Sequence, residues 1–132
     1  MPYLRVKLAC QKSNQNIKQI VAKELTHLAV TKLKKDPNAA TVDIKLCEPE
    51  DWFIAGKPIS QTNLNSFYLE IKITSGTNTR EEKSQFVQAS FAKMQELIGP
   101  LATTSYIVIQ DVASDSWGFG GKTQEWRYIT NK

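Results

Sequence analysis

The sequence is poor in the residues that metal sites and disulfide frameworks require. It has one histidine, His27, and two cysteines, Cys10 and Cys47, in 132 residues. The cysteines match no zinc-ligand spacing, so we expect no metal site. Because no export signal accompanies them, we expect both cysteines to be free thiols.

The sequence also lacks a long apolar run and a concentrated block of charge. No apolar stretch is long enough to span a bilayer, and the strand-like N-terminus carries Arg5 and Lys7, unlike a signal peptide. We therefore expect a cytoplasmic protein with no membrane partner. The net charge of +4 is spread along the chain, which suits attraction of small anions. No aromatic RNA-binding strand motif is present, so no nucleic-acid partner is predicted.

What the sequence does contain is an internal repeat. YLRVKL at 3–8 recurs as YLEIKI at 68–73, and WFIAGK at 52–57 recurs as WGFGGK at 117–122. Both matches lie 65 residues apart. The repeat predicts that one unit of about half the chain occurs twice in tandem.

We accordingly expect a single domain over residues 1–132. Its two pseudo-repeats are predicted at 2–57 and 67–122, with a polar linker at 58–66 and a C-terminal tail at 123–132. In each unit a strand, a helix and a second strand precede an aromatic–glycine turn.

Hydrophobic periodicity assigns the elements. Alternating apolar residues predict four strands, at 3–9, 42–46, 67–73 and 106–110. Helical spacing predicts one helix that Ser13 or Asn14 can cap and that runs to about Lys34, and another over 80–98. Right-handed crossovers make each pair of strands parallel. The predicted fold class is α/β (α+β): a four-stranded sheet with two helices on one face.

Pro2 follows the initiator Met1 directly. If Met1 is removed, Pro2 carries a free secondary amine, and free α-amines have a pKa near ~7.7–8.0 in model peptides. A base close to neutrality can take a proton from one atom and return it to another. The sequence therefore predicts Pro2 as a catalytic base, on condition that Met1 is removed.

Pro2 at the first strand, the two β-α-β units and SWGFGG at 116–121 together resemble the tautomerase superfamily, which includes 4-oxalocrotonate tautomerase and macrophage migration inhibitory factor. The resemblance covers nearly the whole chain. It implies a homotrimer that buries the second sheet face, and a cofactor-free tautomerase acting on a small, anionic enol or α-keto acid. Phe67 stands at the place equivalent to Pro2, so one site per chain is expected.

Several residues are predicted to bind the substrate. Lys35 and Tyr106 match site residues of the family, with Tyr106 next to a neighbouring subunit's proline, and Lys12 is a weaker candidate. Trp117 and Phe119 can form an apolar wall that keeps the amine pKa low. Two further candidates are a fixed cation from the tail and a hydrogen-bonding side chain: Arg127 and Asn78.

Two alternatives stay open at this point. The same fold supports decarboxylases and hydratases or dehalogenases, in which a cationic proline acts as acid or electrostatic anchor. A retained Met1 instead makes the Pro2 nitrogen an amide, which favours a non-catalytic trimeric binding module.

Overall fold

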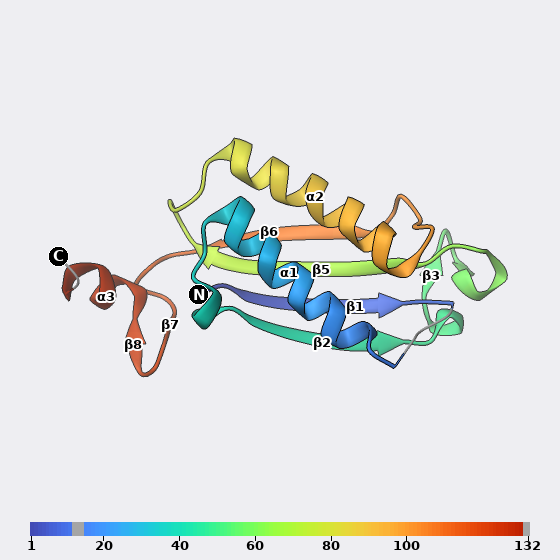
Figure 1. Ribbon diagram of the computed structural model, residues 1–132, viewed down its shortest axis with the longest axis horizontal. Coiled ribbons are helices and arrows are strands. Elements are labelled where there is room, and N and C mark those ends of the chain that lie inside the picture. Colours follow the sequence, from blue (N-terminus) through green and yellow to red (C-terminus); the bar gives the residue numbers. More distant parts are fainter. Residues whose placement is uncertain (12–14, 131–132) are drawn as a thin grey trace.

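The computed structural model describes residues 1–11 and 15–130 and is built around one four-stranded sheet (Figure 1). The strand order is β2-β1-β5-β6. Two long helices, α1 (Ile17–Leu33) and α2 (Arg80–Ile98), cover one face of this sheet. The strands are β1 (Tyr3–Ala9), β2 (Thr41–Cys47), β5 (Ser66–Thr74) and β6 (Tyr106–Val112).

The strand directions confirm the predicted fold class. β1 and β2 are parallel, as are β5 and β6, and the two pairs meet at an antiparallel β1–β5 ladder. In that ladder Arg5 lies opposite Glu70, its own equivalent in the repeat. A pseudo-twofold axis therefore passes between these two residues and relates the two units.

The core lies between the sheet and the helices. Leu4, Val6 and Leu8 of β1 point into it, as do Leu69, Ile71 and Ile73 of β5, and none is more than 2% exposed. Burying a side chain of this kind contributes roughly 1.5–3 kcal/mol. The helices supply the facing residues, namely Val21, Leu25, Leu28, Ala29, Leu33, Phe86 and Met94.

The second helix begins and ends as its sequence predicts. The Thr79 hydroxyl accepts a hydrogen bond from the Glu82 N–H, and the Glu82 carboxylate accepts one from the Thr79 N–H. These reciprocal bonds satisfy donors that a helix start leaves unpaired. Gly99, with φ of 92°, ends α2. The proposed cap of α1 at Ser13 or Asn14, and the candidate Lys12, lie outside the described residues.

Both aromatic turns are β-hairpins with the same register, shifted by 65 residues. β3 (Phe53–Ile54) pairs with β4 (Lys57–Pro58), and β7 (Gly118–Phe119) pairs with β8 (Lys122–Thr123). Because β1 and β5 are antiparallel, the two hairpins lie at opposite ends of the sheet (Figure 1). Only the β7–β8 hairpin lies at the end where the chain begins.

The segments expected to be linker and tail are more ordered than predicted. Residues 58–66 contain the end of β4, a 3-10 helix at Ile59–Gln61 and the first residue of β5. Residues 124–130 form a third helix, α3 (Gln124–Thr130), beyond the β7–β8 hairpin. Leu46 pairs in register with the buried Leu8 but is 45% exposed, since it lies near the end of β2, an edge strand of the sheet.

Two further findings concern the cysteines and the apolar length of the helices. Cys10 and Cys47 are both free thiols, as predicted. Within the described part of the chain, no helix is long and apolar enough to cross a bilayer.

Candidate active site

A cavity of about 280 Å³ lies around Pro2, where β1 begins. The Pro2 side chain is buried, and its carbonyl accepts a hydrogen bond of 3.2 Å from the Thr41 N–H at the start of β2. This bond holds the proline beside the start of β2, at one end of the sheet. The cavity is lined by Met1, Pro2, Tyr3, Ala39, Thr41, Lys72, Trp117, Gly118 and Phe119.

One wall of the cavity comes from the β7–β8 hairpin. The Trp117 indole Nε1–H donates a 3.1 Å hydrogen bond to the Thr74 hydroxyl, which ties the hairpin to the end of β5. A side chain at Gly118 would collide with the carbonyl oxygen of Lys122 across the hairpin. The tight turn therefore presents Trp117 and Phe119 to Pro2, and the structure brings these three predicted residues together.

Arg127 lies against Phe119 and is not among the lining residues. Its Nη2 donates a 2.7 Å hydrogen bond to the Phe119 carbonyl, and its guanidinium carbon lies 3.9 Å from the centroid of the Phe119 ring. Its Nε is buried without a hydrogen-bond partner in the described structure. Arg127 is thus placed to hold the aromatic wall and to add positive potential near it.

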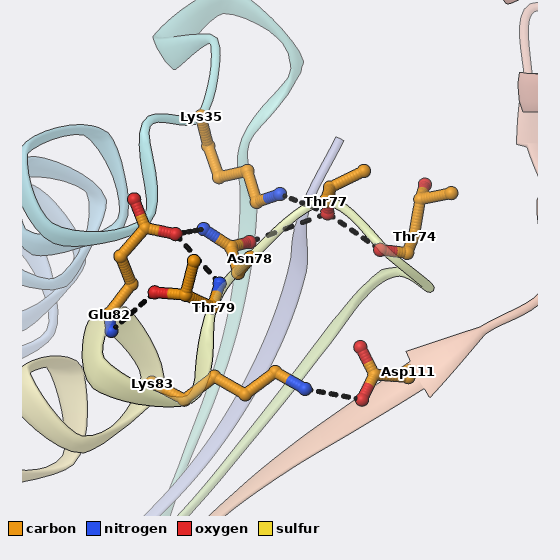
Figure 2. Close-up of polar contacts among 8 residues, drawn as sticks. All are labelled: Lys35, Thr74, Thr77, Asn78, Thr79, Glu82, Lys83 and Asp111. Atoms are coloured by element: carbon orange, nitrogen blue, oxygen red, sulfur yellow. Dashed lines mark hydrogen bonds and ion pairs between the residues drawn. The ribbon is translucent and has the colours of Figure 1, made fainter.

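Lys35 lies on the other side of the N-terminus, after the end of α1. Its Nζ donates a 2.9 Å hydrogen bond to the Thr77 hydroxyl, which donates in turn to the Thr74 carbonyl (Figure 2). Burial lowers the pKa of the Lys35 ammonium, and Glu82 and Asp111 oppose that shift. Lys35 also does not line the cavity.

The α-amine of Met1, next to Pro2, has a lowered pKa. Burial is the largest cause; the positive charges of Lys35 and Arg127 act in the same direction, and Asp36 opposes them. The environment at this end of the sheet therefore favours a neutral amine.

Asn78 is not among the residues that line the Pro2 cavity. Its amide nitrogen donates to the Glu82 carboxylate at 3.2 Å (Figure 2). The same nitrogen donates to the Leu33 carbonyl at 2.9 Å. It joins the end of α1 to the start of α2. The side chain therefore already has a structural role, whereas the sequence predicted one in substrate binding.

Tyr106 lies far from the Pro2 of its own chain. It begins β6 opposite Tyr68, which faces Lys7 near the end of β1. Its side chain is 63% exposed and lines a separate cavity of about 410 Å³ on the open face of the sheet. Any contact between Tyr106 and a proline must therefore involve a second chain.

Lys72 is a cavity residue that sequence reasoning did not select. It lies on the open face of β5, opposite Tyr3 in the β1–β5 register. The alternation of β5 indicated its face, but only the antiparallel register shows that it reaches Pro2. Among residues 1–11 and 15–130, no group of three His, Cys, Asp or Glu side chains is placed to hold a metal ion.

Comparison with known proteins identifies relatives of this chain. Residues 2–62 match the family model described as tautomerase enzyme. A probable tautomerase K2 from Dickeya dadantii (strain 3937) is 29% identical over 56 residues, which cover 42% of this chain and 84% of that protein.

Solved structures extend the likeness to the second unit. A wild-type fused 4-OT, described as a symmetric trimer, matches with a TM-score of 0.80 at 16% identity, over 93% of this chain and 96% of its own. A protein inactivated by 2-oxo-3-pentynoate has a TM-score of 0.80 at 13% identity, over 95% and 98%. A macrophage migration inhibitory factor-like protein from Entamoeba histolytica has a TM-score of 0.75 at 16% identity, over 92% and 97%.

The sequence match begins at Pro2, which lines the cavity, and the fold likeness covers 93% of this chain. These findings confirm the resemblance to the tautomerase superfamily that the sequence indicated: residues 2–62 match its family model, and the fold is similar to that of fused 4-OT.

Proposed function

We propose that this protein is a cofactor-free keto–enol tautomerase that uses Pro2 as its base and acid after Met1 is removed. The observation that carries the proposal is the position of Pro2: it is buried at the edge of a cavity walled by Trp117 and Phe119. The match to the tautomerase family model supports the class of reaction.

The reaction needs one group that can both accept and donate a proton. A neutral prolyl nitrogen takes the proton from the enol oxygen or from the carbon next to the ketone, and the resulting prolyl ammonium returns it to the other atom. No electrons leave the substrate, so no oxidant is required. Because the ring fixes the proline backbone, the lone pair is held in one direction.

The charges and burial around the N-terminus favour a mechanism with a neutral proline as base. Decarboxylation or hydration in this superfamily would instead use a cationic proline. Burial, Lys35 and Arg127 lower the pKa of the Met1 α-amine, which lies next to Pro2. The same surroundings would shift a prolyl amine there toward its neutral form, which is the form that a base needs. A mechanism that uses a cationic proline needs the opposite shift.

The substrate class follows from the walls of the cavity. Trp117 and Phe119 offer an apolar surface, while Lys72 lines the cavity and Arg127 and Lys35 act on its charge from outside. A small 2-oxo acid with an apolar or aryl group matches this combination. We propose phenylpyruvate as the test substrate.

The proposal also includes a homotrimer. The matched fused 4-OT is described as a trimer, and this chain leaves an open sheet face with exposed Tyr106 and Val108. In such an assembly Tyr106 of one chain would approach Pro2 of its neighbour and complete the site.

The test compares the wild-type protein with Pro2→Ala after intact-mass analysis has established that Met1 is absent from both. We expect the wild type to convert enol-phenylpyruvate to the keto form, and Pro2→Ala to lose about a hundredfold or more of kcat/KM. We also expect 2-oxo-3-pentynoate to label the wild type once per chain, on the N-terminal peptide. Undiminished turnover by Pro2→Ala, or a retained Met1 in untagged protein, would overturn the proposal.

A further inference from the structure

We propose that Lys72 is the residue that binds the substrate carboxylate in the Pro2 cavity. This inference rests on the proposed function for the identity of the site, but it concerns which side chain makes the anionic contact. Sequence reasoning gave that role to Arg127 or Lys35, and the geometry points to a different cation.

The register of the sheet brings Lys72 to the cavity. β1 and β5 are antiparallel, and Lys72 lies directly opposite Tyr3, the residue that follows Pro2. Side chains of directly opposed residues share one face of the sheet, with Cβ atoms about 4.5–5.5 Å apart. Lys72 accordingly lines the cavity together with Pro2 and Trp117.

The other two cations near the N-terminus already have protein partners. Lys35 Nζ is hydrogen-bonded to Thr77 at 2.9 Å, and Arg127 is bonded to the Phe119 carbonyl and stacked on its ring. Neither side chain lines the cavity. Each would have to give up a contact before it could bind a ligand directly.

Lys72 differs from both in this respect. It is half-buried, yet within residues 1–11 and 15–130 its ammonium makes no ion pair or hydrogen bond with another side chain. An ammonium group that is partly desolvated and lacks a partner gains most from an incoming anion, because charge-assisted hydrogen bonds are strong where water is partly excluded. The cavity therefore provides a cation on the sheet side and an apolar wall on the hairpin side.

This arrangement defines a ligand class. A carboxylate placed at Lys72 leaves the rest of a small molecule facing Trp117 and Phe119. Pro2 lines the same cavity. An aryl-substituted monocarboxylate fits both requirements, and the matching neutral amide fits only the apolar one.

The experiment measures equilibrium binding and does not depend on turnover. Phenylacetate and its neutral isostere phenylacetamide are titrated calorimetrically into the wild type, Lys72→Met, Lys72→Arg and Lys18→Met. Lys18 is the control because it is an exposed lysine at the start of α1, the end of the helix that lies away from Pro2. Thermal unfolding of each variant reports any structural effect.

We expect Lys72→Met to bind phenylacetate about tenfold or more weakly while its affinity for phenylacetamide stays unchanged. Lys72→Arg should retain most of the phenylacetate affinity, and Lys18→Met should match the wild type. Equal losses for both ligands, no loss in Lys72→Met, or no saturable binding of phenylacetate to the wild type would overturn the proposal.

The two proposals fail in different ways. If Pro2→Ala keeps full tautomerase activity, the proposed function fails, yet the carboxylate discrimination by Lys72 is still measured. If turnover depends on Pro2 but Lys72→Met binds phenylacetate normally, the proposed function stands and the carboxylate has another partner.

Discussion

The proposed chemistry at the start of β1 involves three neighbouring cations, which differ in their contacts. Arg127 stacks on Phe119, Lys35 is bonded to Thr77, and Lys72 lines the cavity without a side-chain partner. The first two act at a distance, by lowering the pKa of the α-amine. Substitutions at these positions should therefore affect different steps of the same reaction.

Lys35→Met should raise the pKa of the N-terminal amine. A nearby positive charge disfavours the protonated amine, so its removal makes protonation easier. The acid limb of the kcat/KM profile with phenylpyruvate should then move to higher pH. Because burial is the larger cause of the shift, part of the lowering should remain.

The control for this prediction is Lys34→Met, which removes the adjacent lysine. Lys34 is exposed and is not among the groups that act on the α-amine. An acid limb that moves equally in both variants, or that moves to lower pH in Lys35→Met, would contradict the assignment.

The repeat provides a second prediction for single residues, at the first turn position of each hairpin. Ala55 has φ of 54° in the β3–β4 turn, and its equivalent Gly120 has φ of 61° in the β7–β8 turn. This left-handed conformation costs a residue with a Cβ about 1–2 kcal/mol. Glycine avoids that cost but loses more backbone entropy on folding, which offsets part of the gain. We expect Ala55→Gly to raise the free energy of unfolding by about 0.5–1 kcal/mol.

The reciprocal change, Gly120→Ala, should lower stability and disturb the site. A Cβ at this position would lie 3.0 Å from Arg127 Nη2, so the guanidinium that stacks on Phe119 must shift by a few tenths of an ångström. Urea unfolding at a fixed protein concentration checks both substitutions. Equal stability of Ala55→Gly and the wild type would mean that the turn carries no strain.

At the scale of elements, the sequence predicted the parts of the fold that hydrophobic periodicity controls. The four long strands, both long helices and their shared face follow from apolar residues at spacings of two and of three to four, as in β1 and α2. The segment after the second hairpin carries no such stripe, and none of α3's residues is buried. Its helix is supported locally, by bonds such as that from Thr130 to the Trp126 carbonyl, which periodicity does not reveal.

The same distinction explains which site residues could be predicted. Trp117 and Phe119 lie in a motif that follows the last strand directly, so their meeting with Pro2 follows from the topology. Lys72 depends on the register between β1 and β5, and Asn78 depends on where two helix ends meet. Neither relationship is encoded in the spacing of residues within one unit.

The capping box of α2 yields a prediction at this scale. Thr79→Ala removes the hydroxyl that accepts from the Glu82 N–H at 3.1 Å. Loss of such a cap typically costs about 1 kcal/mol. Urea unfolding should show this loss, whereas Thr103→Ala, at an exposed threonine in the loop before β6, should leave the midpoint unchanged. Equal midpoints for the two variants would mean that the box does not stabilise the helix.

For the whole molecule, the pseudo-twofold axis creates two similar ends of which one carries Pro2. At the other end Phe67 occupies the equivalent place and is fully buried in the core. Both long helices cover the same face of the sheet, so the other face stays open. That open face carries the rings and charges of Tyr3, Arg5, Tyr68 and Glu70. An assembly that packs these faces together would remove the exposed apolar surface there.

Two valines test whether the open face is the one that assembles. Val108 of β6 and Val87 of α2 are each 38% exposed, but Val108 pairs with Glu70 on the open face whereas Val87 lies on a helix of the covered face. We expect the wild type to be a trimer by light scattering at micromolar concentration. Val108→Asp should shift it toward the monomer, because a carboxylate buried in an interface without a partner is costly.

Val87→Asp introduces the same charge at the same exposure and should remain trimeric, since the helices would face outward. Both variants should keep the far-ultraviolet circular dichroism of the wild type, which separates assembly from folding. A monomeric wild type would remove the trimer from the proposal. Disruption by Val87→Asp with an intact Val108→Asp trimer would mean that the chains associate through their helices, and then Tyr106 could not reach a neighbouring Pro2.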